Sequence, residues 1–116
     1  MIEVSDERFE ALVGEALDSI PDDLARQMDN VAVFVEETSG SNNLLGLYQG
    51  IPLTARTPGG YGGMIMPDRI TIYRRPILLR CRSEADVVHQ VRVTVIHEVG
   101  HHFGIDDERL HELGWA

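Results

Sequence analysis

Two histidines and two acidic residues near the end of the sequence have the spacing of a metal site. His97 and His101 are four residues apart, so on a helix they share one face and a single metal ion can bridge them. Glu98 can reach a metal-bound water without being a ligand. Gly104 is expected to end the helix in the left-handed conformation, and Asp107 can then turn back as the third ligand. Three protein ligands and an open fourth position are typical of a catalytic zinc site rather than a structural one.

These residues resemble the extended HExxHxxGxxD motif of the zincin metallopeptidases, on the metzincin side of that group. His97, Glu98, His101, Gly104 and Asp107 each occupy the matching position. The resemblance is closest to short, single-domain bacterial zincin-like proteins, the minimal zincins, and it then covers nearly the whole chain. It implies a peptidase in which Zn²⁺ held by His97, His101 and Asp107 activates a water. Glu98 would accept the proton as that water attacks a peptide carbonyl.

The end of the chain departs from the metzincin pattern. Metzincins carry a methionine-containing turn after the third ligand, whereas no methionine follows Asp107 here. A second class of function therefore stays open, a metal-binding or protein-interaction domain on a zincin scaffold with little or no hydrolytic activity. The intact Glu98 favours the peptidase, and the absent lower subdomain favours the alternative. Tyr61 is a candidate for a second donor to the developing oxyanion.

Several neighbours compete for the proposed roles. Asp106, Glu108 and His111 are rivals of Asp107 as third ligand, although Asp106 can instead cap the last helix. His102 adjoins the apolar side of the helix, which favours a packing or supporting role, and it could hydrogen-bond Glu98 one turn back. The remaining His89 is expected on the surface, and Cys81 is expected to be a small buried hydrophobe.

The motif falls near the end of a long predicted helix. Ser83 to Asp86 form a capping box that starts it. The histidines at 97 and 101 lie almost opposite an apolar stripe, so one side of the helix should pack on a sheet while the other presents imidazoles to a cleft. The stripe consists of Val88, Val91, Val95, Val99 and Phe103.

The other elements complete an α+β domain, a minimal zincin-like fold spanning residues 1–116. A helix capped by Ser5 should run to Pro21, with a short helix at 22–28. A central strand covered on both faces is expected at 31–35, a second strand at 44–48, and a strand with one buried face at 69–74. Short helices should begin at Pro76 and Asp106. The predicted architecture is a small mixed sheet packed with the N-terminal helix and the long active-site helix.

The glycine- and proline-rich stretch from 49 to 63 predicts a long loop beside the cleft. A short edge strand at Met64–Met66 could follow it, and an extended peptide could add to the edge at 62–66. The candidate substrate-binding residues are Tyr61, Gly62, Gly63 and Met64. Acidic Asp106, Glu108 and Glu112 near the metal would favour a peptide with basic residues.

The composition of the chain limits the classes of partner that it is expected to bind. The net charge of -9 and pI near 4.8 argue against nucleic acid or an anionic membrane, which leaves a peptide or protein substrate as the expected partner. The single cysteine cannot form an intrachain disulfide. The first residues are too acidic for a signal peptide, and no stretch is long and apolar enough to span a bilayer. A cytoplasmic location is therefore the expectation.

Overall fold

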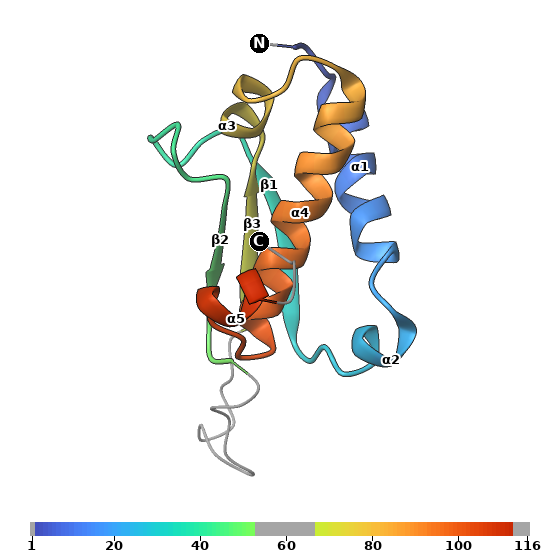
Figure 1. The fold of residues 1–116 in the computed structure, drawn as a ribbon, viewed down its shortest axis with the longest axis vertical. Helices are drawn as coiled ribbons and strands as arrows, with labels where there is room; N and C mark the ends of the chain where they lie inside the picture. Colours follow the sequence, from blue (N-terminus) through green and yellow to red (C-terminus); the bar gives the residue numbers. More distant parts are fainter. Residues whose placement is uncertain (1, 53–66, 113–116) are drawn as a thin grey trace.

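The computed structural model describes residues 2–52 and 67–112. Helices α1 and α4 lie side by side and pack on one face of a three-stranded mixed sheet (Figure 1). The fold is therefore α+β, as the sequence predicts. Among the described helices, none is long and apolar enough to cross a membrane. The elements in chain order are α1 (Asp6–Asp18), α2 (Asp22–Ala25), β1 (Val31–Glu36), β2 (Gly46–Gln49), β3 (Asp68–Tyr73), α3 (Arg74–Leu79), α4 (Glu84–His102) and α5 (Asp107–Glu112).

The strand order is β1-β3-β2, with β1 parallel and β2 antiparallel to β3. The prediction of a central, doubly covered strand at 31–35 is wrong, because β1 lies at one edge of this sheet and Phe34 is 41% exposed. The Arg69 guanidinium lies 4.1 Å from the centre of the Phe34 ring. A cation thus covers the aromatic side chain on the outer face, so a strand with successive apolar residues does not need a helix on each side.

Strand β3 is the central strand, and more of it is buried than the single face that was predicted. Ile70 and Ile72 are fully buried toward the helices, and Thr71, which points to the opposite face, is 1% exposed. The neighbouring strands explain this burial, since Phe34 of β1 and Leu47 of β2 both pair with Thr71 and flank it.

The helix starts follow the predicted capping chemistry. The Ser5 hydroxyl accepts a hydrogen bond from the Arg8 N–H at 3.1 Å, and the Ser83 hydroxyl accepts one from the Asp86 N–H at 3.1 Å. The Asp86 carboxylate in turn accepts the Arg82 N–H at 2.9 Å. Helix α3 starts two residues before the predicted Pro76, which its first turn tolerates because the missing N–H has no helical partner there.

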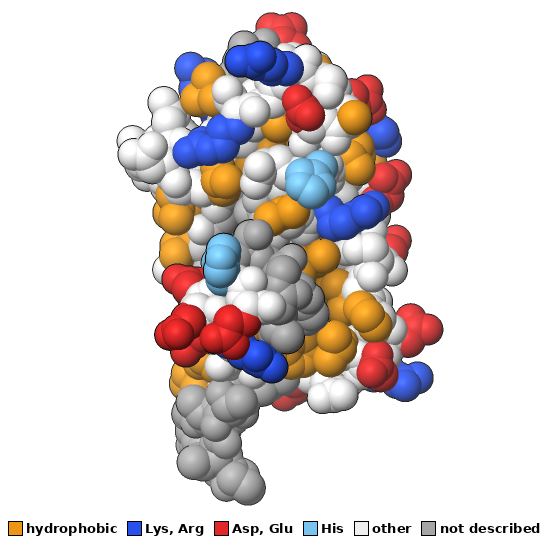
Figure 2. Space-filling model, viewed as in Figure 1, with side chains coloured by type: hydrophobic (Ala, Val, Ile, Leu, Met, Phe, Trp, Pro, Cys, Tyr) orange, Lys and Arg blue, Asp and Glu red, His pale blue; other side chains and the backbone are white. Residues whose placement is uncertain are grey.

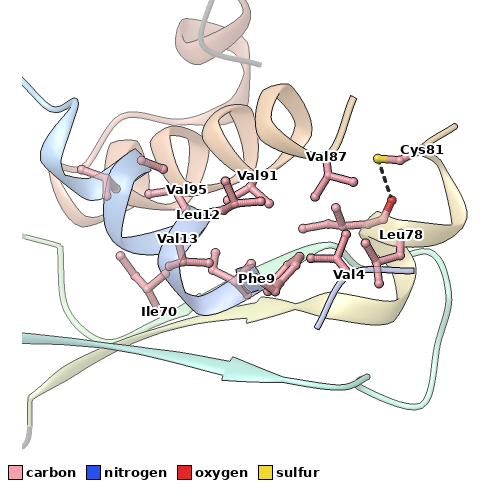
Figure 3. Close-up of a cluster of buried hydrophobic side chains, with 14 of the residues drawn as sticks. Val4, Phe9, Leu12, Val13, Ile70, Leu78, Cys81, Val87, Val91 and Val95 are labelled. Atoms are coloured by element: carbon pink, nitrogen blue, oxygen red, sulfur yellow. Dashed lines mark hydrogen bonds between the residues drawn. The ribbon is translucent and has the colours of Figure 1, made fainter. Parts of the chain in front are cut away.

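The core lies between α1, α4 and β3 (Figure 3). The buried stripe of α4 begins at Val87, which is fully buried, rather than at the predicted Val88, which is half-buried. Cys81 is the predicted small buried hydrophobe: its thiol donates to the Ile77 carbonyl at 3.2 Å, and burial raises its pKa. The buried stripe of α4 continues through Val91, Val95 and Val99, and these contacts hold the helix along its length. The last two turns of α4 lie beside β2.

Candidate metal centre

A cleft of about 580 Å³ runs between the last turns of α4 and strand β2. His97, Glu98 and His101 line it from α4, and Tyr48 lines it from β2. The turn from Gly104 through Asp107 forms one end of the cleft. All four residues predicted to form the metal and catalytic site therefore face a common space, as the motif predicted.

Three potential ligand atoms converge in this cleft. The Nε2 atoms of His97 and His101 are 3.2 Å apart, and Asp107 Oδ1 lies 3.2 Å from the first and 3.0 Å from the second. Around a tetrahedral zinc ion with bonds of about 2.0–2.1 Å, ligand atoms are separated by about 3.3 Å. Three lone-pair atoms at these separations fit a shared cation, since two facing imidazole nitrogens can share only one proton.

A tight turn after α4 places Asp107 at this point. Gly104 has φ +82°, its N–H donates to the His101 carbonyl at 2.9 Å, and the Ile105 N–H donates to the Gly100 carbonyl at 3.0 Å. These paired bonds form a Schellman motif, which reverses the chain at the helix end. The Asp106 carboxylate caps α5 by accepting the Arg109 N–H at 2.8 Å, so it acts as the helix cap, and Asp107 lies against the histidines.

Glu98 lies deeper than the three converging atoms. Its side chain is 7% exposed, and burial raises its pKa to about 7. The backbone N–H of Tyr48 donates to its carboxylate and opposes that rise, and a nearby cation would also favour the ionised form. Gly46 permits this close approach of β2, because a Cβ there would lie 2.9 Å from Thr94 Cγ2 and 3.1 Å from Glu98 Cγ. Strand β2 therefore holds the carboxylate in place.

The electrostatics of His97 also suit metal binding. Partial burial lowers the pKa of His97, and the neighbouring His101 lowers it further, while Asp107 opposes both effects. A lowered pKa favours the neutral imidazole, which is the form that binds a metal. The ligand atoms of His97, Glu98 and His101 all lie within 4.8 Å of one another, so this group could hold a metal ion.

Comparison with known proteins gives the family. A model of the zincin-like metallopeptidases matches residues 28–115. The chain belongs to this family. The fold is similar to that of a solved "conserved hypothetical protein" from Thermo thermophilus, with 24% sequence identity and a TM-score of 0.54 over 95% of this chain and 97% of that one. No curated protein matches the sequence. Membership implies a metal, typically zinc.

Beneath the cleft, this zincin-like protein has a buried polar network that sequence reasoning missed. Asp68 accepts hydrogen bonds from the Tyr48 hydroxyl at 2.5 Å and from the Ile51 N–H at 3.2 Å, and its carboxylate lies 3.0 Å from His102 Nδ1. The Asp29 N–H donates to His102 Nε2 at 3.2 Å, so Nε2 carries no proton and Nδ1 must donate to Asp68. His102 is fully buried, as its predicted packing role requires, but it bonds to Asp68 and Asp29.

This buried network is expected to contribute to the free energy of unfolding of the zincin-like fold. Asp68→Ala should lower the free energy of unfolding by about 3 kcal/mol, because the buried His102 N–H and the Tyr48 hydroxyl both lose this acceptor. Tyr48→Phe removes only one of these bonds and should cost about 1 kcal/mol. Urea unfolding of the metal-free proteins measures both values. Equal losses in the two variants would contradict a central role for Asp68.

The candidate substrate-binding residues of this zincin-like protein lie outside the described residues. These are Tyr61, Gly62, Gly63 and Met64, together with the predicted edge strand at Met64–Met66. Within the described part of the chain, β2 is the strand that borders the cleft, and it stands at an edge of the three-stranded sheet.

Proposed function

We propose that this zincin-like protein is a zinc-dependent peptidase. His97, His101 and Asp107 hold the metal, and Glu98 is the general base. The observation that carries the proposal is the convergence of Asp107 Oδ1 and two imidazole nitrogens within 3.2 Å, next to a buried carboxylate. Asp107 is favoured over Glu98 as third ligand because its oxygen is close to both nitrogens, whereas the Glu98 carboxylate is held by the Tyr48 N–H.

The proposed reaction is hydrolysis of a peptide bond. Zinc, when bound, acts as a Lewis acid and lowers the pKa of a coordinated water. Glu98 accepts a proton from the water as its oxygen attacks the carbonyl carbon, and then delivers this proton to the amine nitrogen as the C–N bond breaks. The Tyr48 N–H orients the Glu98 carboxylate for both transfers.

The walls of the cleft suit an extended chain as substrate. Because β2 ends the described sheet next to the cleft, a peptide can add along Gly46–Gln49 and bond to its backbone groups other than the Tyr48 N–H, which Glu98 uses. A smaller hollow of about 240 Å³ continues past Glu98 between Leu44 and Val93, with room for an apolar side chain. Acidic side chains gather over α5 at the cleft end (Figure 2), which favours peptides with basic residues.

The proposal is tested by loading the protein with zinc and incubating it with a mixed peptide library at neutral pH. We expect about one zinc per chain and new peptide termini detected by mass spectrometry. Removing the metal with a chelator should stop cleavage, and adding zinc should restore it. If the zinc-loaded protein cleaves nothing, the alternative that this chain is a metal-binding or interaction domain is favoured. If wild-type protein binds no zinc, the ligand assignment is wrong.

A further inference from the structure

Helix α5, which carries Asp107, has one buried side chain within its described length. Leu110 is fully buried. The other residues of α5 are exposed, namely Asp107, Glu108, Arg109, His111 and Glu112. The position of this short helix therefore depends on how the Leu110 side chain packs.

The Leu110 side chain packs directly against Gly100 on α4. A Cβ added at Gly100 would lie 2.4 Å from Leu110 Cδ2, 3.3 Å from Cγ and 3.4 Å from Cδ1. Carbon atoms in contact prefer about 3.5–4.0 Å, so even one methyl group would occupy the space of the leucine. Turning the leucine about its last bond moves Cδ2 but leaves Cγ in place. Because Cγ must still give way by a few tenths of an ångström and the side chain is fully buried, we expect the leucine to shift and α5 to shift with it.

This contact controls the third proposed ligand. Asp107 and Leu110 are three residues apart, which places them one turn apart on the same short helix. The valine core holds α4, and with it the two histidines, independently of α5. We propose that Gly100 and Leu110 are positioning residues that set the Asp107 carboxylate against His97 and His101. The inference rests on the proposed zinc site and adds two residues that do not touch the metal.

Zinc affinity measured by competition with a chromophoric chelator tests the inference. Gly100→Ala should weaken zinc binding roughly 10- to 100-fold, the range typical for residues that orient metal ligands. Gly14→Ala is the matched control, since Gly14 also lies in a helix but an added Cβ has nothing within 4 Å. This control variant should bind zinc as the wild type does. Wild-type affinity in Gly100→Ala would overturn the inference and leave the zinc site itself untouched.

A second background separates positioning from general damage to the helix. In Asp107→Ala, the carboxylate that Gly100 is proposed to position is absent. Adding Gly100→Ala should then cause no further loss of zinc affinity. If the double variant binds zinc at least tenfold more weakly than Asp107→Ala, the substitution acts on the histidines or on α4, and the inference is wrong.

Amide hydrogen exchange of the metal-free protein gives a test that does not depend on zinc. The Leu110 N–H donates to the Asp106 carbonyl at 2.9 Å in the first turn of α5. Gly100→Ala and Leu110→Ala should each speed exchange of this amide, while amides of α4 near Val95 keep wild-type rates. In Gly14→Ala the Leu110 amide should not exchange faster than in the wild type. Unchanged protection of Leu110 in Gly100→Ala would overturn the inference even if wild-type protein binds no zinc.

Discussion

Glu98→Gln is expected to abolish peptide hydrolysis while the protein still binds zinc. Glutamine has the shape of glutamate, and its carbonyl oxygen can still accept the Tyr48 N–H, so the cleft should be unchanged. The amide cannot accept a proton from the attacking water. Loss of a general base typically costs about 10²- to 10⁴-fold in rate, which should reduce kcat to near background.

The measurement pairs steady-state cleavage of a fluorogenic peptide with zinc content from the same sample. Glu10→Gln is the control, because it removes one exposed carboxylate on α1 far from the cleft and should leave both values unchanged. Cleavage by Glu98→Gln at the wild-type rate would show that another group is the base. Loss of zinc together with activity would instead mean that Glu98 is itself a ligand.

The double substitution His97→Ala/His101→Ala should eliminate stoichiometric zinc binding. It removes two of three converging atoms and leaves Asp107 alone, and one carboxylate does not retain zinc at micromolar concentrations. The fold should persist, because both side chains line the cleft and the buried valines of α4 are untouched.

Zinc content after gel filtration and far-UV circular dichroism measure the two outcomes. The matched control is His89→Ala/His111→Ala, which removes two exposed histidines and should keep about one zinc per chain. If the His97/His101 variant retains one equivalent of zinc, the proposed site is wrong. If the control variant also loses its zinc, the ligand set includes a histidine outside the motif.

The parts of the site that the sequence predicts depend on local rules. The Ser83 cap, the reversal at Gly104 and the one-turn separation of His97 and His101 each follow from residues a few positions apart. Helix periodicity also indicated that one side of α4 is buried and that His97 and His101 face a cleft. Aspartate is also preferred at the position just before a helix. This preference predicts Asp106 as the cap of the last helix and leaves Asp107 beside the histidines.

The parts that could not be predicted are contacts between distant segments. The alternation in 69–74 identifies a strand but does not reveal that it lies between two others. Nothing near Asp68 in sequence indicates that its carboxylate meets His102, 34 positions later. The backbone N–H of Tyr48 carries no side-chain signal at all, so its bond to Glu98 emerges only once β2 is placed against α4.

The Schellman turn after α4 has a consequence for how the site assembles. Because it returns the chain onto its own helix, all three converging atoms and the Gly100–Leu110 contact come from the stretch 97–110. Closing so short a loop costs little entropy, so this half of the site has very low contact order and can form early in folding. The contact that holds Glu98 in place comes from Tyr48 on β2, about 50 positions earlier, so it forms only after the sheet has formed. Metal capture can therefore precede catalytic competence along the folding path.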